Sequence, residues 1–226
     1  IIIMGIGPED LRILIEYGKK YNIGKKCAIL GDCTFWGFKN ASKEEFKRIM
    51  NFDEVHTFDI NGDPDYKLDL QEDFPDKFRN YYDCVLDVGT LYSCFDVVSV
   101  WKNILFMLAE KGCIWHQTNL VGHFGRGFWS FSPSVFNEFY KANNFKDIDL
   151  KYLFKGGPNK EKWQNISTNC NYLCVSNQVS LKFVNHNCTI RHGILCDTSL
   201  SCFVKRNGIV PFKKPIPEHY IKTNGK

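Results

Sequence analysis

The sequence predicts an α/β protein whose doubly wound, mostly parallel sheet has helices on both faces. Short apolar runs typical of buried strands alternate with amphipathic segments typical of helices as far as residue 154. The helical segments also carry their own start signals. Between residues 155 and 199 this alternation breaks, and a polar, Asn-rich insertion precedes a last apolar run.

Four helices are expected, and each has a recognisable signal. Residues 8–21 place apolar side chains at helical spacing, with acidic residues in the first turn. Ser42, followed by two glutamates, is expected to cap the second helix. The amphipathic segment 96–112 forms the third, with Gly112 expected at its C′ position. Ser132, followed by proline at N1, opens the fourth.

Seven strands are expected between and after these helices. They occupy residues 25–30, 54–60, 65–70, 81–89, 113–120, 147–154 and 199–207. Two further runs, 172–176 and 179–185, have the pattern of a β-hairpin within the insertion. We therefore expect one domain over residues 1–226. The insertion, 155–199, is longer than a connection between two strands needs, so we expect it to cover an acceptor site as a lid.

Composition is that of a globular domain. The chain has 226 residues, 44% hydrophobic and 24% charged, and its net charge of +4 is too small to argue for a nucleic-acid partner. No apolar run approaches the roughly 20 residues that span a bilayer, so no membrane partner is expected. The ten cysteines include no CxxC pair, and several lie in apolar runs. Reduced, structural cysteines and a cytoplasmic location are expected.

Polar residues stand at the carboxyl ends of three predicted strands, where open α/β sheets bind their ligands. Gly31 and Asp32 follow the first strand, Asp59 ends the second, and Asp87 and Gly89 end the fourth. An acid at the end of the second strand can accept two hydrogen bonds from a ribose diol. The alternative for Asp59 is a turn cap within "DINGDPD".

The order of elements from about residue 11 to 154 resembles that of the class I methyltransferases, which use S-adenosylmethionine. The resemblance is strongest in "YYDCVLDVGTLYSCFDVVSVWKNILFMLAEKGCIWHQTNL", with "EKGC" as the turn into the fifth strand, and continues in "FWSFSPSVFNEFYKANNF". It implies a seven-stranded sheet with an antiparallel last strand, and S-adenosylmethionine as cofactor. The implied cofactor-binding residues are Gly31, Asp32, Gly37, Asp59, Asp69, Asp87 and Gly89. Asp69 would take the adenine amino group, or else lie in a solvated loop.

The glycine loop departs from the pattern of that family, an acid followed by G-x-G-x-G. In "LGDCTFWG" Gly31 and Gly37 remain, Asp32 comes one place late, and bulky Phe35 and Trp36 fill the middle. This puts cofactor affinity in doubt more than the fold, because the backbone must approach the cofactor closely there. G-x-G-x-x-G is absent, which disfavours a dinucleotide.

The loop after the fifth strand, "HQTNLVGHFGRGFWSF", supplies groups for chemistry. His123, between glycines, is the first candidate for a general base, and His116 is the second. Each could instead be a hydrogen-bonded structural histidine. Arg126 either binds an acidic group of the acceptor or is a solvated loop residue, and Asn119 lies in the same loop.

Three further groups have weaker signals. Tyr92 and Trp129 either line an acceptor pocket or belong to the core. Cys188, His192 and Cys196 have a spacing that suits zinc on a helix, but the local sequence is not helical, so no metal is predicted.

The leading hypothesis is methyl transfer from S-adenosylmethionine to a small-molecule acceptor, with a hydroxyl of a sugar or related metabolite as the target. The sugar comes from resemblance to enzymes of surface-polysaccharide clusters. One alternative is a non-catalytic methyltransferase-like scaffold or binding module. Another is an RNA methyltransferase, which the mild charge and the lack of an RNA-binding motif disfavour. Assembly into a homo-oligomer stays open.

Overall fold

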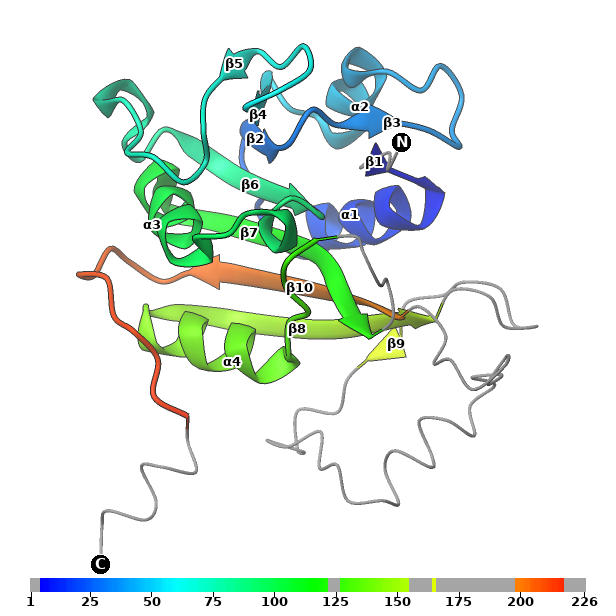
Figure 1. The fold of residues 1–226 in the computed structure, drawn as a ribbon. Coiled ribbons are helices and arrows are strands. Elements are labelled where there is room, and N and C mark those ends of the chain that lie inside the picture. The colour runs from blue at the N-terminus through cyan, green and yellow to red at the C-terminus, as the bar shows by residue number, and fades with distance from the viewer. Residues whose placement is uncertain (1–4, 122–126, 155–163, 166–197, 218–226) are drawn as a thin grey trace, which may run out of the picture.

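One mixed sheet of eight strands carries the fold (Figure 1). The computed structural model describes residues 5–121, 127–154, 164–165 and 198–217. In spatial order the strands are β5 (Tyr66–Lys67), β4 (Glu54–Asp59), β2 (Lys26–Leu30), β6 (Tyr82–Val88), β7 (Leu108–Val121), β10 (Thr198–Arg206), β8 (Phe145–Phe154) and β9 (Gln164–Asn165).

The pairing confirms the predicted topology. β2 lies between β4 and β6 and is parallel to both. β10 is antiparallel to both of its neighbours, β7 and β8. The seven expected strands are therefore present, with the last one antiparallel. Beyond them the two-residue β9 pairs with β8, and a separate two-stranded sheet joins β1 (Gly5–Ile6) to β3 (Thr34–Phe35).

The helices start where the sequence signals place them. They are α1 (Pro8–Lys20), α2 (Lys43–Met50), α3 (Val97–Met107) and α4 (Pro133–Ala142), with short 3₁₀ helices η1 (Asp76–Phe78) and η2 (Leu91–Ser93). The side chains of Ser42 and Ser132 accept backbone N–H bonds at the starts of α2 and α4, as expected. Within the described part of the chain, no helix is both long and apolar enough to cross a membrane.

Successive side chains along the sheet strands point to opposite faces and belong to two hydrophobic cores. Ala28 and Leu30 of β2 belong to the core shared with α3 and α4, and Cys27 and Ile29 to the core shared with α1 and α2. All four are nearly inaccessible to solvent. Strands buried on both faces read as continuous apolar runs, which explains why "CAIL" shows no polar alternation.

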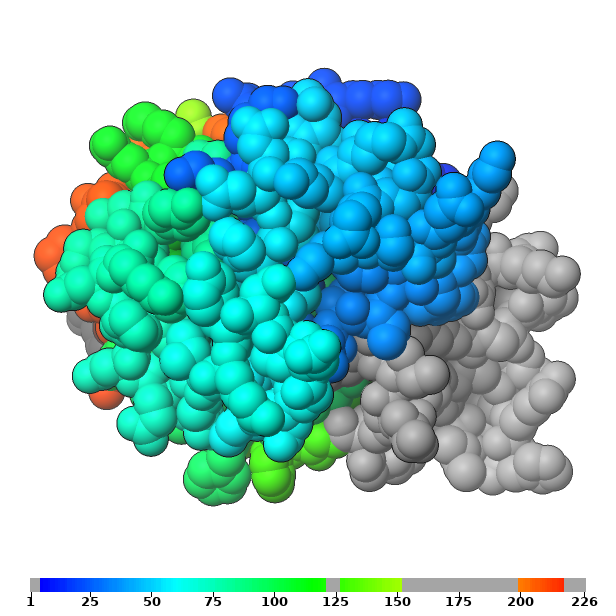
Figure 2. All heavy atoms as spheres, turned by 90° about the horizontal axis from the view of Figure 1, so that it is seen from above, coloured from blue at the N-terminus to red at the C-terminus, as the bar shows by residue number. Residues whose placement is uncertain are grey.

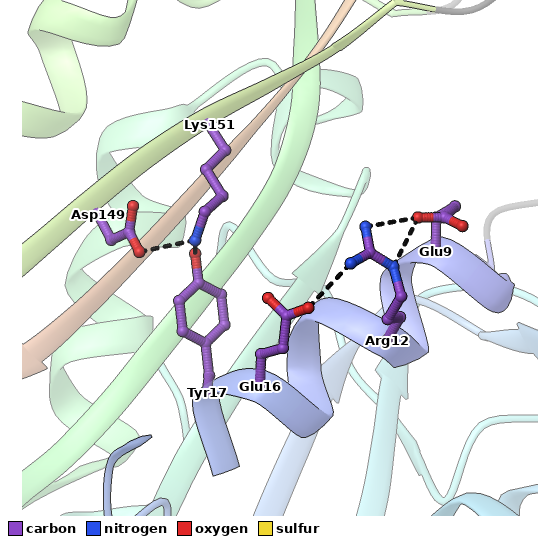
Figure 3. A network of polar contacts seen from close by, with 6 residues as sticks. All are labelled: Glu9, Arg12, Glu16, Tyr17, Asp149 and Lys151. Carbon is purple, nitrogen blue, oxygen red and sulfur yellow. Dashed lines mark hydrogen bonds and ion pairs between the residues drawn. The ribbon is translucent and has the colours of Figure 1, made fainter. Parts of the chain in front are cut away.

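Helix α1 packs against the antiparallel strands β10 and β8 through the side chain of Tyr17 (Figure 3). Its ring stacks on Phe203 of β10 with centroids 4.3 Å apart. Its hydroxyl accepts a hydrogen bond from Lys151 of β8 (3.1 Å), which also pairs with Asp149 (2.8 Å). Burial, and then the carboxylate of Asp149, raise the pKa of Tyr17. On the outer side of α1, Arg12 bridges two glutamates of the same helix.

The third helix ends at Met107, earlier than predicted, because the chain pairs with β6 from Leu108 onward, and a buried arginine from β10 bonds the carbonyls at this helix end. Nη1 of Arg206 donates to the carbonyl oxygens of Leu105 (3.0 Å) and Leu108 (2.8 Å). Burial lowers the pKa of this guanidinium. Gly112 is therefore part of β7 and not a helix C′ residue. A Cβ there would lie 2.9 Å from the carbonyl oxygen of Asp83, so the glycine permits close approach of two strands.

We expect Arg206→Met to destabilise the fold by about 1–3 kcal/mol, because two buried carbonyls lose a charged donor while the aliphatic stem is kept. The neighbouring Lys205→Met is the control, since Lys205 bonds the carbonyl of Asn22 at the surface. Lys205→Met should change the free energy of unfolding by no more than about 0.5 kcal/mol. Urea denaturation of both variants measures the difference, and equal losses would show that the hydrogen bonds of Arg206 to these carbonyls do not stabilise the fold.

Candidate functional site

The turns that follow β2, β4 and β6 are hydrogen-bonded to one another at the carboxyl edge of the sheet. The backbone N–H of Asp32, after β2, donates to Oδ2 of Asp59, at the end of β4 (2.7 Å). The hydroxyl of Thr90, after β6, donates to the carbonyl of Leu30, at the end of β2 (2.7 Å). The three strand ends chosen from the sequence therefore form one continuous edge.

Asp59 acts as a turn cap in this structure, which is the alternative that the sequence offered. Its Oδ1 accepts the N–H of Asn61 (2.9 Å), and its Oδ2 accepts that of Asp32. The carboxylate of Asp32 in turn accepts the N–H of Asp63 (3.1 Å), and Gly62 packs against the same carboxylate. The loop after β4 thus lies on the turn after β2. Figure 2 shows these blue-to-cyan segments packed side by side on one face.

A carboxylate offers about four acceptor positions, so two protein donors leave Asp59 able to accept from a ligand as well. The residue is also half-exposed. Being a turn cap and binding a diol are therefore compatible roles for the same side chain.

Three of the predicted acids act electrostatically on one thiol. The pKa of Cys94, just after η2, is raised to about 12, first by burial and then by the carboxylates of Asp87, Asp69 and Asp59. Oδ1 of Asp69 accepts from the backbone and side chain of Gln71. Among the ion pairs of the described residues, none brings a lysine or arginine to these three acids. The edge is therefore acidic.

Asp87 is fully buried and is the centre of a hydrogen-bond network. Its Oδ1 accepts the N–H groups of Thr90 (2.9 Å) and Leu91 (3.0 Å), which shapes the turn after β6. Its Oδ2 lies 2.7 Å from Nδ1 of His116 on β7, and Nε2 of His116 contacts the hydroxyl of Tyr140 on α4. A neutral imidazole that donates to Asp87 and accepts from Tyr140 satisfies all three groups.

The burial of His116 and Asp87 bears on the roles predicted for them, a general base and a cofactor-binding residue. Both ring nitrogens of His116 have protein partners, and its side chain is inaccessible to solvent. The geometry is that of a hydrogen-bonded structural histidine, the alternative to a general base. Asp87 likewise holds the turn of Gly89, where φ is +84°, and does not face solvent. We expect both residues to act by positioning that turn.

Tyr92 and Trp129 occupy different environments. Tyr92 is buried, and its carbonyl accepts the N–H groups of Phe128 (2.9 Å) and Trp129 (3.2 Å). A Cβ at Gly89 would lie 3.2 Å from the Tyr92 ring, so this ring packs directly on the turn after β6. Trp129, 41% exposed, is the one that faces solvent.

The second glycine of "LGDCTFWG" lies away from this edge. Gly37, with φ of +79°, packs against Pro8 at the start of α1. Phe35 belongs to β3 and contacts the ring of Phe46 in the core (centroids 5.3 Å apart), while Trp36 packs over Gly7. Of the loop, Gly31 (φ of +97°) and Asp32 therefore reach the strand-end site.

Several predicted residues lie outside the described ranges. These are His123, Arg126, Cys188, His192 and Cys196, together with the hairpin of the insertion. Asn119 is described: it is buried, and its carbonyl accepts the N–H of Phe131.

Sequence reasoning missed Thr90, Cys94 and Tyr140. An acid three residues before a threonine is a local capping pattern that points to the Asp87–Thr90 turn. The contact of Tyr140 with His116 joins α4 to β7 and has no local signal.

We expect Tyr140→Phe to lower the free energy of unfolding by about 1–3 kcal/mol, because Nε2 of His116 is left buried without its donor. Tyr66→Phe is the matched control, since no hydrogen bond of the Tyr66 hydroxyl is found among the described residues, and it should change stability by less than about 0.5 kcal/mol. Chemical denaturation compares the two. A Tyr140→Phe protein as stable as the control would show that the network contributes nothing to stability.

No protein-family model matches the chain, and no curated protein matches its sequence. Solved structures do resemble it. A candidate methyltransferase of Bacillus halodurans superposes with a TM-score of 0.53 at 9% identity, over 87% of this chain and 98% of that one. A SAM-dependent methyltransferase of Archaeoglobus fulgidus gives 0.51 at 10% identity, over 87% and 94%.

A third similar structure is phosphoethanolamine N-methyltransferase 2 of Haemonchus contortus, in complex with phosphomonomethylethanolamine and S-adenosylhomocysteine. Its TM-score is 0.52 at 14% identity, over 91% of this chain and 55% of that one, so the chain spans about half its length. The antiparallel last strand described above is the one that the resemblance in the sequence implied. The chain therefore has the class I methyltransferase fold.

Proposed function

We propose that this protein transfers a methyl group from S-adenosylmethionine to a hydroxyl of a small-molecule acceptor. The observation that carries the proposal is the carboxyl edge of β2, β4 and β6, where hydrogen bonds join the three turns and where the carboxylates of Asp32 and Asp59 reach solvent. S-adenosylmethionine has a sulfonium, an ammonium and one carboxylate, so its net charge is positive. Within the described part of the chain, no lysine or arginine forms an ion pair with these two acids, and such carboxylates attract a cationic molecule.

The acceptor groups of this edge also suit the parts of that cofactor. The half-exposed carboxylate of Asp59 has acceptor positions left for a ribose diol, and Asp69 would accept from the adenine amino group. Gly31 and Gly89, both at positive φ, would let the backbone approach closely. The turn of Gly89 is kept in shape by Asp87. When bound, the cofactor supplies an electrophilic methyl group.

On a hydroxyl acceptor, the oxygen forms a bond to the methyl carbon as the carbon–sulfur bond breaks, and the hydroxyl proton must leave. His123 is the base we propose for that proton, on sequence grounds. The insertion of residues 155–199 is proposed as the lid over the acceptor.

A non-catalytic module with the same fold is the second candidate, and one observation favours it. Both oxygens of Asp59 already accept backbone N–H groups, so the loops after β2 and β4 are tied together without any ligand. A sheet that serves only as a scaffold would keep these hydrogen bonds of Asp59 and need no cofactor.

Cofactor binding separates the two candidates. We expect S-adenosylmethionine and S-adenosylhomocysteine to bind, and Asp59→Ala to weaken binding by about 1–3 kcal/mol through loss of charge-assisted hydrogen bonds. Asp53→Ala, an exposed acid at the amino end of β4, is the control and should bind as the unaltered protein does. Isothermal titration calorimetry measures both. No binding at millimolar cofactor would favour the non-catalytic module.

The base is tested kinetically. His123→Ala should lower kcat by about 10²- to 10⁴-fold, the usual contribution of a positioned base. The cofactor Kd should stay the same, because the proposed cofactor contacts lie on other strand ends. Release of S-adenosylhomocysteine with an active acceptor gives kcat, and calorimetry gives Kd. Full activity of this variant would remove His123 from the mechanism.

A further inference from the structure

Three aromatic rings are exposed together near the carboxyl edge of the sheet. Phe95, Phe128 and Trp129 are 69%, 66% and 41% exposed. The rings of Phe95 and Phe128 are perpendicular with centroids 5.6 Å apart, and those of Phe95 and Trp129 are 6.3 Å apart. Each large apolar side chain gains about 1.5–3 kcal/mol when it is buried, so a contiguous exposed group suggests a binding surface. We call these three residues the aromatic cluster.

Hydrogen bonds hold two residues of this cluster, Phe128 and Trp129, in place. The N–H groups of Phe128 and Trp129 both donate to the carbonyl of Tyr92, and Nε1 of Trp129 donates to the carbonyl of Cys94 (3.0 Å). Gly127 lies so close to Tyr92 that a Cβ would come within 2.7 Å of the Tyr92 carbonyl oxygen. The indole of Trp129 is fixed before a ligand arrives, so it loses little conformational freedom on binding.

The cluster adjoins the proposed cofactor site. Tyr92, which anchors it, packs on the turn of Gly89. Cys94, whose carbonyl accepts from Trp129, also contacts the carbonyl of Thr90 in that turn through its thiol (3.6 Å). An occupant of the cluster would therefore lie beside a cofactor bound at that edge. This continuity favours the acceptor as the occupant over a second protein.

We propose that the aromatic cluster binds the acceptor and that the acceptor is a flat aromatic molecule carrying the hydroxyl, a phenol. This inference rests on the function proposed above. Aromatic rings pair with other rings in stacked and edge-to-face arrangements, and the cluster offers both a face and an edge. Its only side-chain polar group, the indole N–H, is already used by Cys94, so these side chains offer no hydrogen bond to the several hydroxyls of a sugar.

The test compares two alcohols that share a fused ten-carbon skeleton. 1-Naphthol is flat and aromatic, whereas 1-decalol is saturated and puckered. Calorimetry on the full chain, saturated with S-adenosylhomocysteine, should show tighter binding of 1-naphthol. Phe95→Leu and Trp129→Leu should each lower the affinity for 1-naphthol by about 2- to 12-fold, which is the contribution of an aromatic pair. Neither variant should change the affinity for 1-decalol. Ile209→Ala, an equally exposed apolar residue outside the cluster, should change neither.

The outcomes separate this inference from the proposed function. Binding of S-adenosylhomocysteine together with equal affinity for the two alcohols, or with tighter binding of choline or glucose, would overturn the phenol and leave the methyltransferase standing. Absence of S-adenosylhomocysteine binding would overturn the function itself. Unchanged thermal midpoints of the leucine variants would show that a lost affinity comes from the cluster and not from unfolding.

Discussion

The buried carboxylate of Asp87 is the constraint on which the functional edge depends. A charge without access to water is unfavourable unless its lone pairs are satisfied, and here two N–H groups of the following turn and the imidazole of His116 satisfy them. His116 is in turn held by Tyr140 of α4. One side chain therefore fixes the end of β6, the middle of β7 and the helix that covers them.

The same logic of shared hydrogen bonds extends along the edge. Asp59 joins the turns after β2 and β4, and Thr90 joins those after β6 and β2. Because no lysine or arginine forms an ion pair with Asp32 or Asp59 in the described part of the chain, the edge is suited to a cation more than to a phosphate. The negative charge of this edge therefore distinguishes it from dinucleotide-binding sites, which hold phosphates. The absence of the G-x-G-x-x-G pattern after β2 agrees with this difference.

Sequence patterns located the strands and most helix starts, because both depend on neighbouring residues. Ser42 and Ser132 bond N–H groups within their own helices, so their roles could be read locally. The end of α3 could not, because it depends on pairing of Leu108 with β6 and on Arg206, which bonds the end carbonyls from a strand far along the chain. Gly112 therefore looked like a helix stop although it serves the close approach of β6 and β7.

The candidate site divides in the same way. By itself the sequence determined which acids and glycines stand at strand ends, since apolar runs mark where each strand stops. Only the tertiary structure decided that Asp59 is already a cap, that His116 is enclosed between Asp87 and Tyr140, and that Gly37 belongs to the packing against α1. The spacing of apolar residues along the sequence indicates which residues share one face of the same helix or strand. Burial and hydrogen-bond partners depend on which segments meet, and that is decided when the sheet and its helices pack together.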